Sequence, residues 1–250
     1  MTVLLALALL AAPAAKSAAE PVTAILVHGA FADGAAWNKV IPKLEAKGLR
    51  AFAVQLPETS LADDVAATRR MIEAAKGPVV LVGHSYGGVV ITNAAEGQAS
   101  VKALVYVSAL APDQGESAND LLGKYPPVAG DAHIQPQSGD YLWLDPSAFR
   151  ESFCQDVPAP EAKLLASAQK PINKSAFGEK LAGAATWHKL PSWFVLTTND
   201  RMVSPELQKF EAKRMESTVV EIAASHVPFL VKPTEVAKAI IAAAAAKAKE

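Results

Sequence analysis

The sequence has one cysteine and no surplus of either charge. Cys154 stands alone among 250 residues, which excludes an internal disulfide and any metal site built from cysteines. The formal net charge is -1 and the basic residues are scattered, so neither a nucleic-acid-binding surface nor a polybasic membrane patch is expected. We expect Cys154 to be a structural thiol and the partners to be small molecules.

Long apolar runs are scarce too. The longest lies at the N-terminus, where residues 3–10 are apolar and small residues follow. This pattern is typical of a secretory signal peptide cleaved near Ala15 or Ala19, although no basic residue precedes Lys16. We expect residues 1–19 to be a signal peptide of a periplasmic or secreted protein, the alternative being a cytoplasmic protein with an N-terminal extension. No membrane-spanning helix is expected.

The remaining composition, 51% hydrophobic and 20% charged, suits one globular α/β domain. Apolar runs predict strands at about 22–28, 49–56, 79–82, 101–110, 191–198 and 218–223, and helical spacing or caps predict helices at 36–47, 60–75, 88–97, 204–215 and 234–246. Strict alternation of the two predicts a doubly wound, mostly parallel sheet of about six strands.

Residues 111–190 interrupt this alternation. Eight prolines between Pro112 and Pro171 break the periodicity, and aromatic residues are interspersed. A connection of this length without strand signals predicts an inserted cap of short helices over the site. Residues 20–110 and 191–250 would then form the core domain.

The segment around which the chain is organised runs from Gly77 to Ile91. A short apolar run is followed by Gly83-His84-Ser85-Tyr86-Gly87, which fits the pattern G-x-S-x-G. Such a strand-to-helix turn exposes the serine hydroxyl near a helix N-terminus, where N–H groups favour negative charge. A glycine-rich turn with a capping serine is the alternative, but the flanking strand and helix patterns favour Ser85 as a nucleophile.

A serine nucleophile needs a base, which is usually a histidine oriented by a carboxylate. His226 follows the last predicted strand and is the predicted base. Asp200 follows the preceding strand and is the predicted acid, with Asp113 as its rival, because the acid is expected between serine and histidine in the chain. All of these residues lie at carboxyl ends of strands, where ligands bind in open α/β sheets.

The other four histidines have less specific settings. We expect His84 to pack in the core and His28 to shape its loop through hydrogen bonds, while His133 and His188 lie in the predicted cap and could touch substrate. Their spacing does not indicate a metal site, and no cofactor is expected.

Two backbone N–H groups are needed to bind an oxyanion. The motif supplies Tyr86, the residue after the nucleophile, and the loop after the first strand supplies Ala30. Phe31 and Trp143 are predicted to line the substrate pocket, with core packing as the alternative for both.

His28-Gly29-Ala30, Gly83 to Gly88, Thr198-Asn199-Asp200 and Ser225-His226 together resemble an α/β-hydrolase over residues 22–239. The chain is similar to the branch that holds plant methylesterases, of the methyl salicylate esterase type, and hydroxynitrile lyases. That resemblance implies a triad of Ser85, Asp200 and His226 and an oxyanion hole of Ala30 and Tyr86. The lyases carry a lysine and a threonine where this chain has Val227 and Gly29, which favours ester hydrolysis.

These observations predict a serine carboxylesterase that hydrolyses small, fairly apolar esters through an acyl-enzyme. The alternatives are a hydroxynitrile lyase-like C–C lyase and a non-catalytic receptor for a small ligand. The sequence does not determine the acyl and alcohol preference, nor whether the protein is a monomer or a homodimer.

Overall fold

The computed structural model describes residues 20–246. The predicted signal peptide, residues 1–19, lies outside the described residues, as do residues 247–250. Among the helices that the structure describes, none combines the length and the apolar character needed to cross a membrane.

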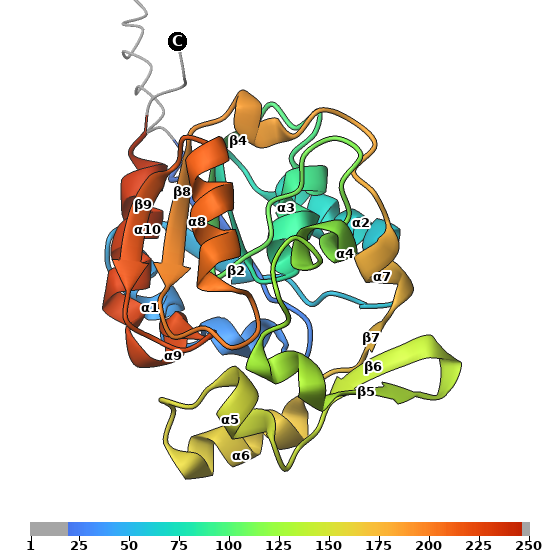
Figure 1. Cartoon of the computed structure of the whole chain (residues 1–250). Helices are drawn as coiled ribbons and strands as arrows, with labels where there is room; N and C mark the ends of the chain where they lie inside the picture. The colour runs from blue at the N-terminus through green and yellow to red at the C-terminus, as the bar shows by residue number, and fades with distance from the viewer. Residues whose placement is uncertain (1–19, 247–250) are drawn as a thin grey trace, which may run out of the picture.

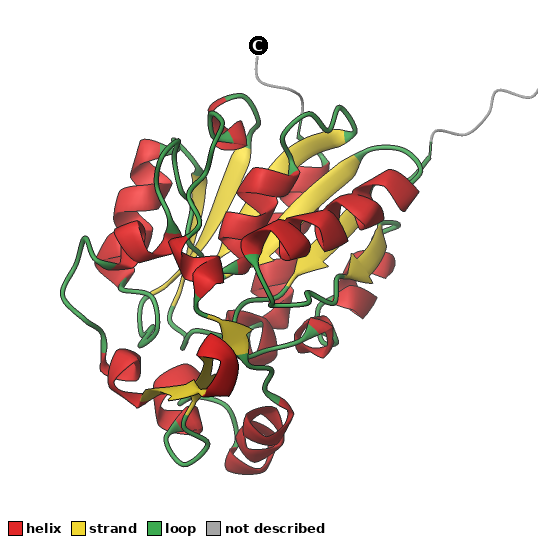
Figure 2. Cartoon of the chain, turned by 90° about the vertical axis from the view of Figure 1, so that its right-hand side faces the viewer, coloured by secondary structure: helices red, strands yellow, loops and turns green. Residues whose placement is uncertain are grey.

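Six parallel strands form the central sheet, in the order β2-β1-β3-β4-β8-β9 (Figures 1 and 2). The three strands at its centre, β1, β3 and β4, are almost entirely buried, which explains their continuous apolar runs. The predicted doubly wound sheet is thus confirmed. Its strands are β1 (Thr23–Val27), β2 (Arg50–Ala53), β3 (Val79–His84), β4 (Val101–Val107), β8 (Ser192–Thr197) and β9 (Thr218–Ile222).

Helices cover both faces of the sheet (Figure 2). α2 and α3 pack together against β1 and β3, α1 and α10 pack together on the other face, and α8 packs on β8. Ser60 caps α2 and Ser204 caps α8, each through its side-chain oxygen, as their sequence patterns predict. The core helices are η1 (Gly34–Trp37), α1 (Ile41–Glu45), α2 (Leu61–Ala74), α3 (Gly87–Ala94), α8 (Pro205–Arg214), α9 (Pro228–Val231) and α10 (Pro233–Ala244).

One predicted helix is wrong in extent. The sequence pattern predicts a continuous helix over residues 36–47, but the structure has the 3-10 turn η1, a turn, and the short α1. Pro42 explains the break, because it has no N–H to donate to a carbonyl one turn earlier and is tolerated only in the first turn of α1.

Residues 111–190, which we call the cap segment, hold more than the short helices predicted. Three short strands form an antiparallel sheet in the order β5-β6-β7. The strands escaped prediction because they have two to four residues and because Pro136 lies within β5, where it is tolerated on an edge strand. The segment contains α4 (Ala118–Leu122), η2 (Ala129–His133), β5 (Ile134–Gln137), η3 (Ser138–Asp140), β6 (Tyr141–Leu144), α5 (Phe149–Phe153), α6 (Ala159–Ala168), β7 (Ile172–Asn173), α7 (Ser175–Gly178) and η4 (Thr186–His188).

The carboxyl ends of the central strands point toward α5, α6 and the small sheet, at the bottom of Figure 1. Residues 20 and 246, the ends of the described chain, lie at the opposite end of the sheet. Because the chain passes from β1 outward to β2 and then back to β3, the loops after β1 and β3 diverge and leave a crevice between them. That crevice is where the candidate site residues meet.

Candidate active site

Ser85 follows β3 directly and adopts a left-handed backbone conformation, with φ 54. Its N–H donates to the carbonyl of Val107 at 3.2 Å, and its carbonyl accepts from the N–H groups of Gly88 and Leu110 at 2.9 and 3.1 Å. A non-glycine residue in this region is strained, and three backbone hydrogen bonds hold Ser85 there. The turn therefore presents the serine side chain above the end of the sheet.

Two glycines allow the close approach that this turn needs. A Cβ on Gly83 would lie 2.5 Å from the carbonyl oxygen of Gly87, which explains why strand and helix can meet so tightly. A Cβ on Gly29 would lie 2.6 Å from the Cβ of Ser85. The loop after β1 thus touches the serine itself.

His226 and Asp200 are brought together from the loops after β9 and β8. The Nδ1–H of His226 donates to Asp200 Oδ2 at 2.8 Å, and both side chains are buried. The rival acid, Asp113, instead binds the exposed ring of His188, with 3.1 Å between Oδ1 and Nε2. Of the two acids, only Asp200 is in contact with the predicted base, His226.

Four further groups are placed to donate to the Asp200 carboxylate. The backbone N–H groups of Met202 and Val203 lie 2.8 and 3.0 Å from Oδ1. The Gln208 amide and the Thr197 hydroxyl lie 2.9 and 3.0 Å from Oδ2. These donors replace the water that a buried carboxylate loses. No pattern in the sequence indicates that Thr197 and Gln208 contact Asp200, because that contact depends on how α8 packs on β8.

Ser85 and His226 line one small cavity, of about 40 Å³, which we call the inner cavity. Part of its wall comes from the core, namely Ala30, Phe31, Leu110 and residues after β8. The cap segment contributes Leu122, Asp131, Ile134, Phe153 and Phe177. Among the described residues the Ser85 hydroxyl has no hydrogen-bond partner.

Ala30 and Tyr86 flank Ser85 from the loops after β1 and β3. Within residues 20–246, neither backbone N–H donates a hydrogen bond. The Tyr86 side chain is buried and its hydroxyl donates to Asp64 Oδ2 at 2.8 Å. Burial and this carboxylate raise the pKa of Tyr86 above its usual value, so the phenol stays protonated and anchors the turn.

His84 packs in the core, as expected, but it also contacts the predicted base. Its Nε2–H donates to the backbone carbonyl of His226 at 2.9 Å, and the two ring centroids are 4.5 Å apart. Burial, followed by the neighbouring His226, lowers the pKa of His84 well below its usual value. A neutral His84 therefore supports the loop that carries His226.

His28 shapes the loop after β1 through both ring nitrogens. Nε2 accepts from the N–H of Leu56 at 3.1 Å, which leaves Nδ1–H to donate to the carbonyl of Gly29 at 2.9 Å. Burial lowers the pKa of His28 to about 4, so the ring is neutral at physiological pH. The prediction of a loop-shaping histidine agrees with these contacts.

A second buried carboxyl group, Glu58, lies close to His28. Both carboxyl oxygens are buried without a hydrogen bond in the described chain, and Oε1 lies 4.0 Å from His28 Nδ1. Burial raises the pKa of Glu58 to about 9, although the charge of Lys170 acts in the opposite direction. The residue has φ 60, a strained backbone for glutamate. Nothing in the sequence pattern pointed to it.

The four remaining residues considered in the sequence have different settings. Phe31 lies in the wall of the inner cavity, with φ 62. Trp143, on β6, lines neither the inner cavity nor the larger cavity between α5, α6, η1 and α9. His133 binds Ser152 through Nδ1 at 2.9 Å.

Cys154 is buried, and burial raises the pKa of its thiol to about 12, which makes it unreactive. Among residues 20–246, no group of three or more potential ligand side chains could hold a metal ion.

A six-stranded parallel sheet with a serine turn, a histidine and an aspartate at its strand ends defines a hydrolase-type α/β fold. The sequence profile of the alpha/beta hydrolase family matches residues 24–239, and the chain belongs to this family. It is thus a member of a family of hydrolases and esterases.

Individual relatives support the same placement. A probable hydrolase, R7, from Phoma sp. is 30% identical over 82% of this chain and 90% of its own length. The crystal structure of a pyrethroid hydrolase from Sphingobium faniae is 26% identical, with a TM-score of 0.77, over 90% of this chain and 98% of its own.

Two Arabidopsis thaliana proteins confirm the resemblance to the methylesterase and hydroxynitrile lyase branch. Methylesterase 8 is 24% identical over 84% of each chain. An alpha-hydroxynitrile lyase is 32% identical over 42% of this chain and 46% of its own.

Proposed function

We propose that this protein is a serine carboxylesterase that hydrolyses small, fairly apolar esters through an acyl-enzyme. The observation that carries the proposal is the pair of His226 Nδ1 and Asp200 Oδ2, 2.8 Å apart, with the same histidine beside Ser85 in the inner cavity. A nucleophile, a base and an orienting acid are the three parts that acyl transfer to serine needs. Relatives named as a methylesterase and a pyrethroid hydrolase support this reaction class.

In the proposed mechanism, Ser85 Oγ attacks the ester carbonyl while His226 Nε2 takes the hydroxyl proton. Asp200 fixes the ring with Nδ1–H toward the carboxylate and stabilises the positive charge that His226 gains. The N–H groups of Ala30 and Tyr86 bind the oxyanion. Both groups are available for it, because neither donates a hydrogen bond to another acceptor in the described chain.

Collapse of the tetrahedral intermediate breaks the bond between the carbonyl carbon and the alcohol oxygen, and His226 returns its proton to that oxygen. Water then attacks the acyl-enzyme in the same way, with His226 as base. The carboxylic acid leaves and the Ser85 hydroxyl is restored.

Replacement of the nucleophile tests the proposal. Ser85→Ala should reduce hydrolysis of p-nitrophenyl acetate to the background rate while the protein stays folded by circular dichroism. Ser192→Ala is the matched control, because Ser192 is also buried but begins β8 at the far end of the sheet. Unchanged turnover in Ser85→Ala would remove serine catalysis from consideration.

The C–C lyase remains a second candidate because a hydroxynitrile lyase is among the relatives. Two features oppose it: Val227 is buried and apolar where the lyases carry lysine, and a side chain at position 29 would collide with Ser85. We expect no release of cyanide from mandelonitrile above the buffer rate. Rapid release would favour the lyase.

A receptor without catalysis is the third candidate. It predicts that an organophosphate fails to label Ser85, since labelling requires an activated nucleophile. We expect stoichiometric labelling, measured by intact-protein mass spectrometry, and its loss in His226→Ala.

A further inference from the structure

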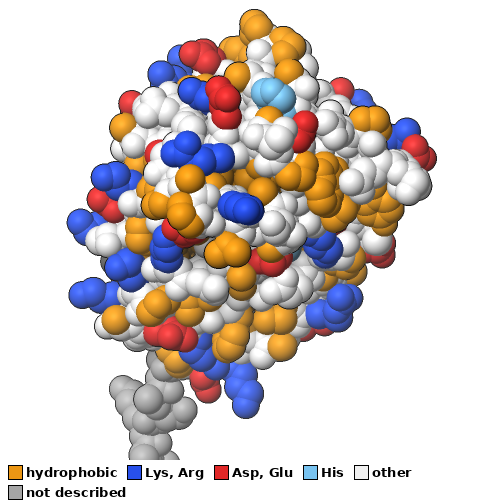
Figure 3. All heavy atoms as spheres, turned by 90° about the horizontal axis from the view of Figure 1, so that it is seen from below, with side chains coloured by type: hydrophobic (Ala, Val, Ile, Leu, Met, Phe, Trp, Pro, Cys, Tyr) orange, Lys and Arg blue, Asp and Glu red, His pale blue; other side chains and the backbone are white. Residues whose placement is uncertain are grey.

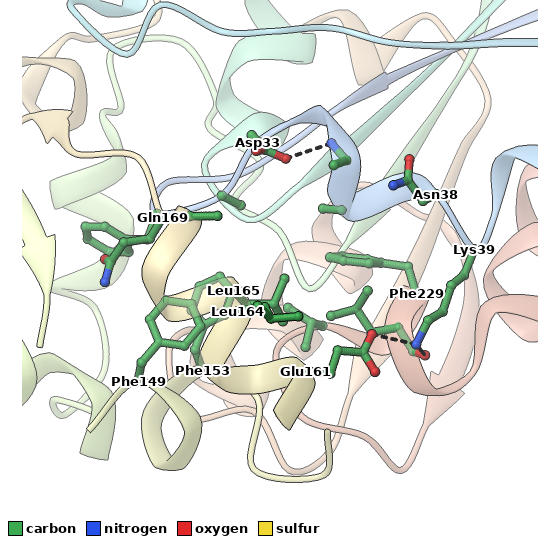
Figure 4. A pocket seen from close by; sticks show the side chains of 17 residues that line it. Asp33, Asn38, Lys39, Phe149, Phe153, Glu161, Leu164, Leu165, Gln169 and Phe229 are labelled. Carbon is green, nitrogen blue, oxygen red and sulfur yellow. Dashed lines mark hydrogen bonds and ion pairs between the residues drawn. The ribbon is translucent and has the colours of Figure 1, made fainter. Parts of the chain in front are cut away.

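A second, larger cavity lies next to the inner one. It has a volume of about 340 Å³ and runs between α5 and α6 of the cap segment and η1 and α9 of the core (Figure 4). We call it the outer cavity. Phe31 and Phe153 line both cavities, so these two rings stand between the outer cavity and Ser85.

The outer cavity is lined mainly by apolar side chains. Phe149, Leu165 and Phe229 project into it, as Figure 4 shows. Of the three charged residues in its lining, Lys39 and Glu161 form an ion pair, with 2.6 Å between Nζ and Oε1, and Asp33 accepts a hydrogen bond from the N–H of Ala35 at 2.7 Å. A cavity of this kind favours an uncharged, apolar group rather than an ion.

The lining of the outer cavity includes residues of α5 and α6, which lie at the bottom of Figure 1. Leu164, on α6, lines the cavity and is 71% exposed, the most exposed large hydrophobic side chain in the described chain. The face that Figure 3 views from below carries separate hydrophobic patches among mixed charges. An exposed leucine at a cavity mouth is suited to capture an apolar molecule from water.

We propose, on the basis of the proposed esterase function, that the outer cavity binds the alcohol part of the ester and that the inner cavity binds a short acyl group. The preferred substrates are then esters of short acids with long or bulky apolar alcohols. Two observations assign the two ends of the substrate in this way.

The first is the position of the base. His226 must return its proton to the alcohol oxygen, and Val227 and Phe229, which follow it in the chain, line the outer cavity. The alcohol must also depart before water can attack the acyl-enzyme. Beyond Phe31 and Phe153, the outer cavity gives it an exit, because Leu164 and Lys39 at the rim are exposed.

The second is the size of the inner cavity. At about 40 Å³ it has roughly one eighth of the 340 Å³ of the outer cavity, so it holds far fewer non-hydrogen atoms. Leu110 and Val203, each 2% exposed, are part of its wall. Enlarging it would displace packed core residues, which is costly. A short acyl chain fits, whereas a long one does not.

A pair of isomers tests the assignment, because octyl acetate and methyl nonanoate have the same atoms and differ in which end is long. We expect kcat/KM for octyl acetate to exceed that for methyl nonanoate by at least about tenfold, the discrimination that a few methylenes give in an apolar pocket. A preference for methyl nonanoate, or equal rates, would overturn the assignment.

Filling the outer cavity provides the second measurement. Leu165→Trp should lower the ratio of kcat/KM for octyl acetate over ethyl acetate by about tenfold or more. Lys163→Trp adds the same bulk on α6 but outside this cavity, and should leave the ratio unchanged. Titration with a small organophosphate counts the folded sites in each variant. An unchanged ratio in Leu165→Trp would contradict the proposal.

The two proposals can fail separately. If wild type and Lys163→Trp hydrolyse none of these esters and Ser85 is not labelled, the esterase function itself is wrong. If they hydrolyse the esters in a Ser85-dependent reaction but Leu165→Trp leaves the ratio unchanged, the esterase function stands and only the two-cavity assignment is wrong.

Discussion

Asp200 and Glu58 are both buried acids in loops at the carboxyl ends of strands, but their surroundings are opposite. Asp200 has five donors within hydrogen-bond distance, from two backbone N–H groups, two side chains and His226. Glu58 accepts no hydrogen bond through its carboxyl oxygens in the described chain, and its pKa is raised to about 9. One setting supports a negative charge, and the other opposes it.

The comparison shows that burial alone does not determine what a carboxyl group can do. A buried carboxylate is useful as a partner for imidazolium only where donors compensate its lost hydration. The last residue of β8, the loop after it and α8 supply those donors, whereas the loop after β2 does not supply them to Glu58. Because Glu58 is neutral, it places no negative charge beside His28, and such a charge would favour protonation of the His28 ring.

The largest effect is expected when the negative charge of Asp200 is removed. Asp200→Asn removes the charge that stabilises imidazolium and allows the wrong ring tautomer, so kcat for p-nitrophenyl acetate should fall by about 10³ to 10⁴. Steady-state kinetics measure the change. A loss below about tenfold would show that Asp200 is not the orienting acid.

The second prediction concerns Glu58 and the pH dependence of stability. Its pKa is about 4.5 in an ordinary setting and about 9 in the folded protein. Below pH 4.5 Glu58 is protonated in both the folded and the unfolded protein, so its contribution to the free energy of unfolding is fully present. As the pH rises toward 9, Glu58 ionises only in the unfolded chain, so the free energy of unfolding falls. From about pH 6 to about pH 9 the loss should be on the order of 1–3 kcal/mol.

Glu58→Gln should remove most of that loss, because its side chain stays neutral at every pH. Chemical denaturation at several pH values gives the free energy of unfolding. Glu216→Gln is the matched control: Glu216 also has a left-handed backbone, with φ 52, but is exposed. Parallel pH profiles for wild type and Glu58→Gln would contradict a neutral Glu58.

A smaller effect is expected when one donor is taken from Asp200. Gln208→Leu removes the amide that donates to Oδ2 at 2.9 Å and keeps much of the volume. We expect kcat to fall by about 3- to 10-fold, in line with the loss of one hydrogen bond to a charged group. The substitution also removes the acceptor of the Thr197 N–H, which should lower the stability of the protein. The assay should therefore be run well below the melting temperature of the variant. No change in kcat would mean that the other donors suffice.

The smallest effect is expected at the exposed acid. Asp113 follows β4 and binds His188 at the surface, so Asp113→Asn should change kcat/KM by less than about twofold. The same ester assay measures it. A large loss of activity would reopen the choice between Asp113 and Asp200.

The arrangement of the core could be predicted from the sequence because each local signal agreed with the whole. Buried runs such as Val79 to Val82, the glycines around Ser85 and the cap at Ser60 all have short-range physical causes. The contact of Asp200 with His226 was anticipated from chain order, because parallel strands deliver their carboxyl ends to one edge.

The surroundings of these residues could not be predicted in the same way. Gln208 reaches Asp200 only because α8 packs on β8, and Glu58 is enclosed only because the cap segment covers its loop, with the N–H of Asn173 bound to its carbonyl. Such contacts join segments far apart in the chain and leave no periodic signal. The outer cavity likewise exists only once α6 lies against η1.

The ends of the described chain lie at the far end of the sheet from α5 and α6, as Figure 1 shows. A carrier protein or a solid support joined there would face away from the mouth between α6 and η1. An immobilised form should therefore keep the access of dissolved esters to Ser85, which is the orientation that a reusable catalyst requires.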